Sequence, residues 1–327
     1  MTMMLRFNRQ TLPLHAEFLI AGARCRIATN SADVLESTVC WRTKTRQPHC
    51  AASFEMEVLV DSAMENTAHD PIFFRGHQHL VFAMLPPRGV VTYDLLRRRV
   101  HAVLSAAAAR DRSFWNNVLL PITIGVLGTT VGVVPLHSAC LDHNGTGVLV
   151  AGASGAGKST LAAALAGCGF SFVSDDWTYI SKDASALVAY GLSSPVKLLP
   201  DTVQFFPRLK DIAPHRTLNG ELAYEIDPSW AGFSVNYISH PRRVLFLERT
   251  LKPGCDFVPC RSEYVREFFE KSAERLPNEL REAKAFRRSI IQTLSSVPAW
   301  ILRTGESPQI TAAAISDFIL EAGDATN

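Results

Sequence analysis

The sequence lacks the features that mark secreted, zinc-binding or nucleic-acid-binding proteins. Its seven cysteines are scattered, odd in number and without a CxxC pair, a pattern typical of reduced cytosolic thiols. Cys255 and Cys260 have no second ligand pair for zinc. The start, MTMMLRFNRQ, shows neither the apolar segment nor the cleavage site of a signal peptide. With 33 basic and 31 acidic residues, the net charge of +2 is too small for general attraction to nucleic acid. We therefore predict a cytoplasmic protein with no nucleic-acid partner.

Long hydrophobic runs are also scarce, and one stretch tests the prediction of a soluble chain. Residues 118–136, VLLPITIGVLGTTVGVVPL, are uncharged and close to the length that spans a membrane, and they contain the spacing Gly128-x3-Gly132. Pro121 and several threonines and glycines dilute the run, which leads directly into a strand-like segment. We expect a buried core helix and no membrane partner.

The organisation of the chain predicts an α/β protein of two domains. A length of 327 residues with 47% hydrophobic and 20% charged residues indicates a folded chain, and no repeat or low-complexity segment is present. Short β-like runs fill residues 10 to about 100, and the Ala-rich segment 101–127 predicts helix. We expect a β-rich amino-terminal domain over 1–115 and a catalytic domain over 116–327. The β-like runs are EFLIAG, CRIAT, SFEMEVLV, IFFRG, HLVFAML and GVVTYDLL.

From Val133 the pattern changes to strand, Gly-rich turn, helix and strand. Further β-like runs follow in WTYIS, ALVAY and RVLFLER. The charged, periodic segment 261–296 predicts helical structure, and ITAAAISDFILEA predicts a closing helix.

A phosphate-binding loop is the most specific motif. GASGAGKS fits GxxxxGK[ST] in full, between the apolar strand GVLVA and the helix TLAAALAG. Glycines let backbone N–H groups form an anion nest, and the helix N-terminus adds a positive dipole end. We expect Lys158 to reach the β- and γ-phosphates of a nucleoside triphosphate and the Ser159 hydroxyl to bind Mg²⁺. The predicted nucleotide-binding residues are Gly152, Ser154, Gly155, Ala156, Gly157, Lys158, Ser159 and Thr160.

Two adjacent carboxylates follow the loop. The short strand FSFVS leads to Asp175 and Asp176, which we expect beside the loop at the carboxyl ends of the strands. One carboxylate suffices for Mg²⁺, and the second would be available to take a proton from an acceptor hydroxyl. A turn or helix cap is the alternative interpretation, mainly of Asp176. Glu248, at the end of RRVLFLERT, is a competing candidate typical of mechanical or transport ATPases, but no Asp-Glu doublet and no LSGGQ-like signature accompany it.

With these residues in view, 137–180 resembles the HPr kinase/phosphorylase family. The similarity lies in PLHSAC, GVLVAG, GASGAGKST and GFSFVSDD. The resemblance implies a P-loop core related to phosphoenolpyruvate carboxykinase, Asp175 as general base, Asp176 assisting at the metal or phosphate, and His137 close to the transferring phosphate. On composition alone, His137 would be a core histidine.

Weaker similarity extends to SSPVKLLPDTVQFFPRL, where Lys197 and Arg208 become candidate phosphate or substrate contacts, whereas we expect His77 and His79 on a sheet surface. The chain departs from the family at Thr160, where HPr enzymes carry an acidic residue, and it has no LEIRGLGIIDV signature.

The predicted function is transfer of the γ-phosphate of ATP, with Mg²⁺, to a hydroxyl, with Asp175, His137 and Lys158 as catalytic residues and Ser159 and Asp176 at the metal. The expected acceptor is a serine of a protein or peptide. The alternatives are a small-molecule kinase and a regulatory or hydrolytic ATPase without a dedicated acceptor. A homo-oligomer is compatible with the sequence.

Overall fold

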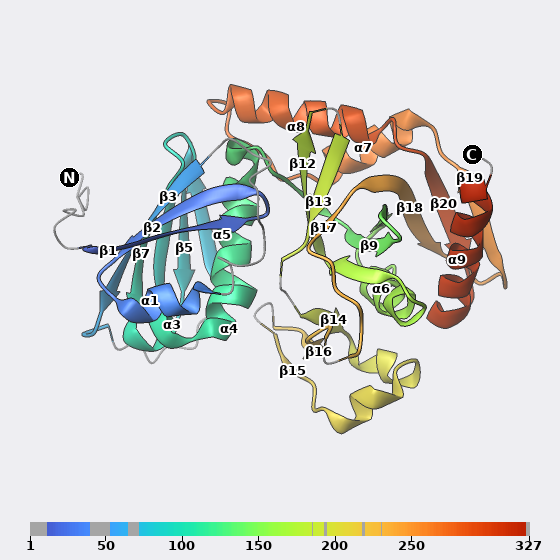
Figure 1. Cartoon of the computed structure of the whole chain (residues 1–327), viewed down its shortest axis with the longest axis horizontal. Coiled ribbons are helices and arrows are strands. Elements are labelled where there is room, and N and C mark those ends of the chain that lie inside the picture. The colour runs from blue at the N-terminus through green and yellow to red at the C-terminus, as the bar shows by residue number, and fades with distance from the viewer. Residues whose placement is uncertain are drawn as a thin grey trace. The chain divides into compact units, whose positions relative to one another are not determined.

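The protein folds as a mixed α/β chain with several sheets. The structure, a computed structural model, describes residues 12–39, 53–64, 72–184, 186–192, 195–217, 220–229 and 231–324. The chain divides into two compact units, Met1–Val134 with Arg275–Arg287, and Pro135–Glu274 with Arg288–Asn327 (Figure 1). The predicted boundary between residues 115 and 116 thus falls inside the first unit. Of the seven cysteines, Cys40 and Cys50 lie outside the described residues, and the other five are free thiols.

The first unit is built on a seven-stranded sheet of order β1-β2-β3-β7-β6-β5-β4. Its strands β2, β3 and β7 run parallel to one another, and the remaining pairs are antiparallel. Buried side chains alternate along β3 and β7, as the two-residue period of a half-buried strand requires. The strands are β1 (Leu14–Ile20), β2 (Ala23–Thr29), β3 (Ser53–Asp61), β4 (Phe73–His77), β5 (Leu80–Leu85), β6 (Gly89–Asp94) and β7 (Arg99–Ser105).

The helix predicted over 101–127 is wrong in its first five residues, 101–105, which belong to strand β7. Val100, Ala102 and Leu104 are fully buried, while His101 faces Glu57 of β3 at 3.0 Å. This alternation has the period of a strand, and the helical pattern begins only at Ala106. The helices that lie wholly in this unit are α1 (Ala32–Ser37), α3 (Ala106–Arg110), α4 (Arg112–Phe114) and α5 (Leu120–Leu127), with a π-helical turn at Trp115–Leu119 and a 3-10 turn at Gly128–Val131. The first residues of α8 (Arg281–Leu294) also belong to it.

The apolar run expected to be a core helix is helical only as far as Val131. Residues 134–136 belong to the next strand. Among the described residues, Arg112–Val131 is the one helical run long and apolar enough to cross a membrane by length and composition, and 67% of its apolar window is buried inside the protein. Trp115, near its start, is fully buried and donates its ring N–H to the carbonyl oxygen of Ala108 at 3.1 Å.

The second unit centres on a six-stranded sheet of order β11-β9-β10-β18-β20-β19. Its strands β10, β18 and β20 are parallel, and β9 is antiparallel to both β10 and β11. Helices α6 and α9 lie side by side, as Figure 1 shows, and share one apolar core with the sheet that includes Leu165, Phe170 and Ile315. The strands are β9 (Ala139–His143), β10 (Thr146–Ala151), β11 (Ser171–Ser174), β18 (Pro241–Arg249), β19 (Cys255–Pro259) and β20 (Ala299–Thr304).

Two smaller sheets complete this unit. One has the order β17-β13-β12-β8 and the other β14-β16-β15. Their strands are β8 (Val134–His137), β12 (Trp177–Asp183), β13 (Ala186–Tyr190), β14 (Val196–Leu198), β15 (His215–Arg216), β16 (Leu222–Ile226) and β17 (Ile238–Ser239), with 3-10 turns η4 (Pro200–Gln204) and η5 (Pro207–Asp211).

The helical segment predicted over 261–296 consists of two helices. Residues 273–280, which include Pro277, interrupt it. The helices are α6 (Lys158–Gly167), α7 (Ser262–Ser272), α8 (Arg281–Leu294) and α9 (Pro308–Asp324).

Candidate active site

The Gly-rich loop connects β10 to α6. Gly152 has φ +152°, and a Cβ there would lie 2.8 Å from the carbonyl oxygen of Leu247 on β18, so only glycine permits this approach. Gly157, the N-cap of α6, is left-handed with φ +93°. The first N–H groups of a helix have no partner within the helix, which makes this end a ready anion-binding site.

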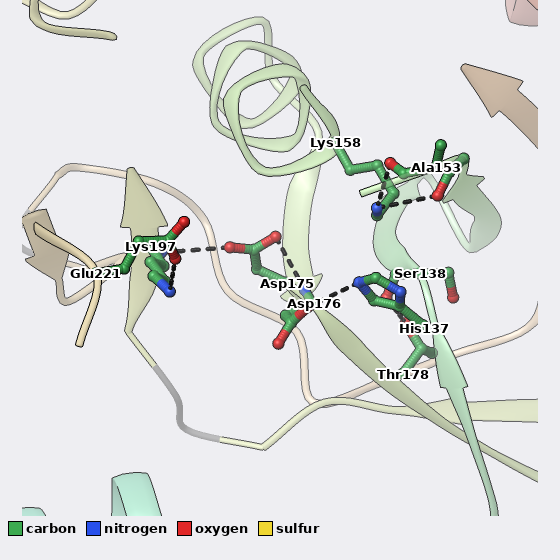
Figure 2. Close-up of polar contacts among 10 residues, drawn as sticks. His137, Ser138, Ala153, Lys158, Asp175, Asp176, Thr178, Lys197 and Glu221 are labelled. Atoms are coloured by element: carbon green, nitrogen blue, oxygen red, sulfur yellow. Dashed lines mark hydrogen bonds and ion pairs between the residues drawn. The ribbon is translucent and has the colours of Figure 1, made fainter. Parts of the chain in front are cut away.

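Lys158 is held against the loop. Its side chain is buried, and Nζ donates to the carbonyl oxygens of Gly152 and Ala153, each at 3.1 Å (Figure 2). Burial lowers the pKa of Lys158, while the negative charges of Asp176 and Asp175 oppose that shift. The ammonium group is therefore already oriented at the mouth of the loop.

Strand order brings the aspartates to the same edge of the sheet as the loop. Because β9 is antiparallel to both of its neighbours, β10 and β11 run in one direction and end on one side. The loop follows the end of β10, and Asp175 and Asp176 follow the end of β11. This is the crevice at strand carboxyl ends in which α/β sheets bind ligands.

Asp175 points into the protein. It is buried, its Oδ1 accepts from the N–H of Asp176 at 2.9 Å, and its Oδ2 accepts from the N–H of Lys197 at 3.3 Å. Burial raises the pKa of Asp175 to about 6, although a hydrogen bond from the Ser159 side chain acts in the opposite direction. The carboxylate thus contacts the serine at the end of the Gly-rich loop.

Asp176 points the other way. It has φ +65°, which few residues other than glycine, asparagine and aspartate adopt, and its side chain is 59% exposed. Its Oδ1 lies 3.0 Å from Nε2 of His137 on β8, and Figure 2 draws this pair. The His137 ring packs against the ring of Trp177, with centroids 5.6 Å apart. Burial alone would raise the pKa of Asp176, but the hydrogen bond and charge of His137, with Lys158 and Lys197, hold that pKa below its usual value.

Lys197 adds a cation beside the pair. Its Nζ lies 2.5 Å from the Glu221 carboxylate, and its backbone N–H donates to Asp175. Figure 2 draws both contacts. Glu221 lies just before β16, far along the chain, and no local sequence pattern marks it.

The other candidates lie elsewhere. Glu248 is paired on the surface with Arg303 at 3.2 Å, and Arg208 is exposed on η5. In the first unit, His77 is exposed on β4, and His79 lies 3.9 Å from Asp94.

A cavity of about 590 Å³ joins the loop, the aspartate and the histidine. Asp176 lines it, whereas Asp175 and Glu248 do not. Arg249 and Phe205, which the sequence analysis did not select, line it too. The remaining lining residues include His137, Ser154, Gly155, Ala156, Gly157, Lys158, Ser159, Thr160, Lys197, Glu221 and Pro308.

The donor set at the loop fits Mg²⁺ held in the presence of phosphate. In the part of the chain that the structure describes, no group of three or more His, Cys, Asp or Glu side chains is placed to hold a metal by itself. Mg²⁺ commonly takes one or two carboxylates together with phosphate oxygens and waters. Ser159 and the two aspartates would supply such a partial set.

The comparisons with known proteins give structural likeness but no match by sequence. No known family profile matches the chain. No curated protein matches it either. Among solved structures, the Hpr(Ser) kinase/phosphatase from Coxiella burnetii is similar at 14% sequence identity with a TM-score of 0.32, over 58% of this chain and 93% of that one. A likeness of this size assigns no family, and the inferences below depend on the site itself.

Proposed function

We propose that the protein is an ATP- and Mg²⁺-dependent phosphotransferase of the HPr-kinase-like type, with a P-loop core, that acts on a hydroxyl group. The observation that carries the proposal is the convergence of Lys158, Ser159, Asp176 and His137 on one cavity. A loop that binds phosphate and a carboxylate beside a histidine are the two parts that phosphoryl transfer to a hydroxyl requires.

The geometry supports a division of labour between the aspartates. Asp175 contacts Ser159 and two backbone N–H groups, so it suits the metal side of the site. Asp176 faces the cavity beside His137, so it suits the acceptor side. The raised pKa of Asp175 favours the opposite assignment, which the family resemblance also implies. We propose Asp176 as the base because a base must reach the proton that it removes.

In the proposed reaction the acceptor oxygen forms a bond to the γ-phosphorus as the bond to the β,γ-bridging oxygen breaks. Asp176 accepts the hydroxyl proton, and His137 orients that carboxylate. Lys158 exchanges its loop carbonyls for phosphate oxygens and stabilises their charge. Mg²⁺, when bound with the nucleotide, neutralises phosphate charge.

We further propose a serine of a protein or peptide as acceptor and the cytoplasm as the place of action. A hydrolytic ATPase that uses Glu248 is less well supported, because that carboxylate is paired with Arg303 and does not line the cavity.

The proposal is tested with γ-labelled ATP and cell extract separated into protein and small-molecule pools. We expect label in the protein pool with the wild type. Lys158→Ala should abolish transfer because it removes the charge that serves the phosphates, and thermal unfolding should show a folded variant. Lys210→Ala, which alters an exposed lysine on η5, is the control. Label in the small-molecule pool would show that the acceptor is a small molecule and not a protein or peptide. Undiminished transfer by Lys158→Ala would refute the assignment of the Gly-rich loop as the phosphate-binding site.

A further inference from the structure

The cavity extends past the phosphate loop on the side away from the aspartates. In the sheet, β9 and β11 flank β10 on one side, and β18 flanks it on the other. Leu247 and Arg249, at the end of β18, line the cavity there together with Pro308, the first residue of α9. None of these residues takes part in the transfer chemistry proposed above.

Two hydrogen bonds hold this end of the cavity together. Gln309 Nε2 donates to the carbonyl oxygen of Phe205 at 2.8 Å, which joins the start of α9 to the end of η4. Arg249 Nη1 donates to the carbonyl oxygen of Glu306 at 2.9 Å, which fixes the guanidinium beside the same turn. Segments about one hundred residues apart in the chain thus form one wall.

The chemistry of this wall suits a flat aromatic ligand. Leu247 and Pro308 are buried apolar surfaces, the Phe205 ring is half-buried, and Arg249 is exposed. Planar guanidinium groups and aromatic rings stack on nucleobases. Thr311, the polar α9 side chain that lines the cavity, is buried and already bonded to Thr304 at 3.0 Å.

We propose that Phe205, Leu247, Arg249 and Pro308 form the nucleobase subsite of the nucleotide whose phosphates bind the Gly-rich loop. This inference rests on the proposed function and adds to it the residues that distinguish a nucleotide from a bare polyphosphate. The γ-phosphate lies toward Asp176 and the base toward β18. A cavity of about 590 Å³ is within the usual range for a ligand of nucleotide size.

The test compares two probes, Mg²⁺-ATP and Mg²⁺-tripolyphosphate, by titration calorimetry on the full chain. Phe205→Ala and Arg249→Gln should each weaken ATP binding about tenfold, the effect of losing one stacking partner, and leave tripolyphosphate binding unchanged. The controls are Phe206→Ala, the neighbouring ring outside the cavity lining, and Arg303→Gln, the neighbouring strand's arginine that is paired with Glu248.

Each outcome decides between the two proposals. If both variants bind the two probes with equally reduced affinity, or with unchanged affinity, the nucleobase subsite is refuted. The assignment of the Gly-rich loop as the phosphate site is unaffected by that result. If the wild type binds neither probe, the proposed function fails and the subsite fails with it. Having two variants keeps the test valid where one of them unfolds.

Discussion

Asp175 and Asp176 are neighbours in the chain but lie in opposite environments. One carboxylate is buried and satisfied by two N–H groups, while the other faces the cavity beside His137. The left-handed backbone at Asp176 separates them, because it turns one side chain inward and the next outward. Their pKa values are therefore displaced in opposite directions, upward for Asp175 and downward for Asp176.

Removing the charge of Asp175 should change how stability depends on pH. Its pKa rises from 3.8 in the unfolded chain to about 6 in the folded protein, so the folded state binds the extra proton between these values. The free energy of unfolding therefore falls as pH rises through this window, and the full contribution of this group, reached above pH 6, is roughly 3 kcal/mol.

Chemical denaturation of the wild type and Asp175→Asn at pH 4, 5, 6 and 7 measures this contribution. The contributions of the other titrating groups cancel when the free energy of unfolding of the variant is subtracted from that of the wild type. We expect the stability of the wild type relative to the variant to fall across this range. A difference that is constant with pH would contradict the inward position of Asp175.

The two aspartates should also differ in function. Asp176→Asn should retain ATP binding and lose transfer by about 10² to 10⁴, as removal of a general base does. Asp175→Asn should instead alter the Mg²⁺ dependence or the nucleotide affinity, because it changes the group that contacts Ser159.

Nucleotide titration and single-turnover transfer on both variants separate these effects, with Glu248→Gln as the control on the neighbouring surface. The reverse pattern would make Asp175 the base. If neither substitution slows transfer, the pair is structural and the kinase proposal is wrong.

Among the elements, strand-loop-helix units are the easiest to predict. GVLVA, GASGAGKS and TLAAALAG correspond to β10, the loop and α6, because glycine, apolar strand and Ala-rich helix signals agree at each position. Strand β7 was missed because its residues lead directly into a run of four alanines, and the high helix propensity of that run concealed the alternation before it.

The candidate site was predictable only in the part that is local in the chain. Lys158, Ser159 and the aspartates lie within twenty residues and carry recognisable spacing. Glu221 and Arg249 reach the cavity through the pairing of β14 with β16 and of β10 with β18. Long-range strand pairing leaves no local pattern from which those residues could have been chosen.

At the scale of the loop, Gly152→Ala should destabilise the second unit by a few kcal/mol. Its φ of +152° is unfavourable for alanine, and the added Cβ would lie 2.8 Å from the Leu247 carbonyl oxygen. Gly167→Ala, at the end of α6 with open space around it, should be neutral or stabilising by up to about 1 kcal/mol. Thermal unfolding of both variants checks the contrast. Equal effects would mean that β18 does not approach the loop this closely.

For the whole molecule, we expect recovery without detergent. The apolar run Arg112–Val131 packs inside its own unit, with Trp115, Leu119 and Ile124 fully buried, so little of it is left to contact lipid. Fractionation of cells expressing the chain, followed by size-exclusion chromatography without detergent, tests this. Recovery only from detergent-extracted membranes would contradict both the core assignment and the proposed cytoplasmic location.

The left-handed conformation of Asp176 affects how mutational scans of this region should be interpreted. Alanine at that position would remove the carboxylate and would also cost roughly 1 kcal/mol of backbone strain. An alanine scan would therefore attribute the strain, as well as the lost carboxylate, to a catalytic role. Asparagine tolerates the conformation and keeps the size of the side chain, so it isolates the charge, whereas glycine removes the whole side chain without the backbone penalty. Of the two carboxylic acids, the turn favours aspartate over glutamate, because the short aspartate side chain tolerates the left-handed region better. Local backbone geometry thus narrows the choice of acid independently of any selection for catalysis.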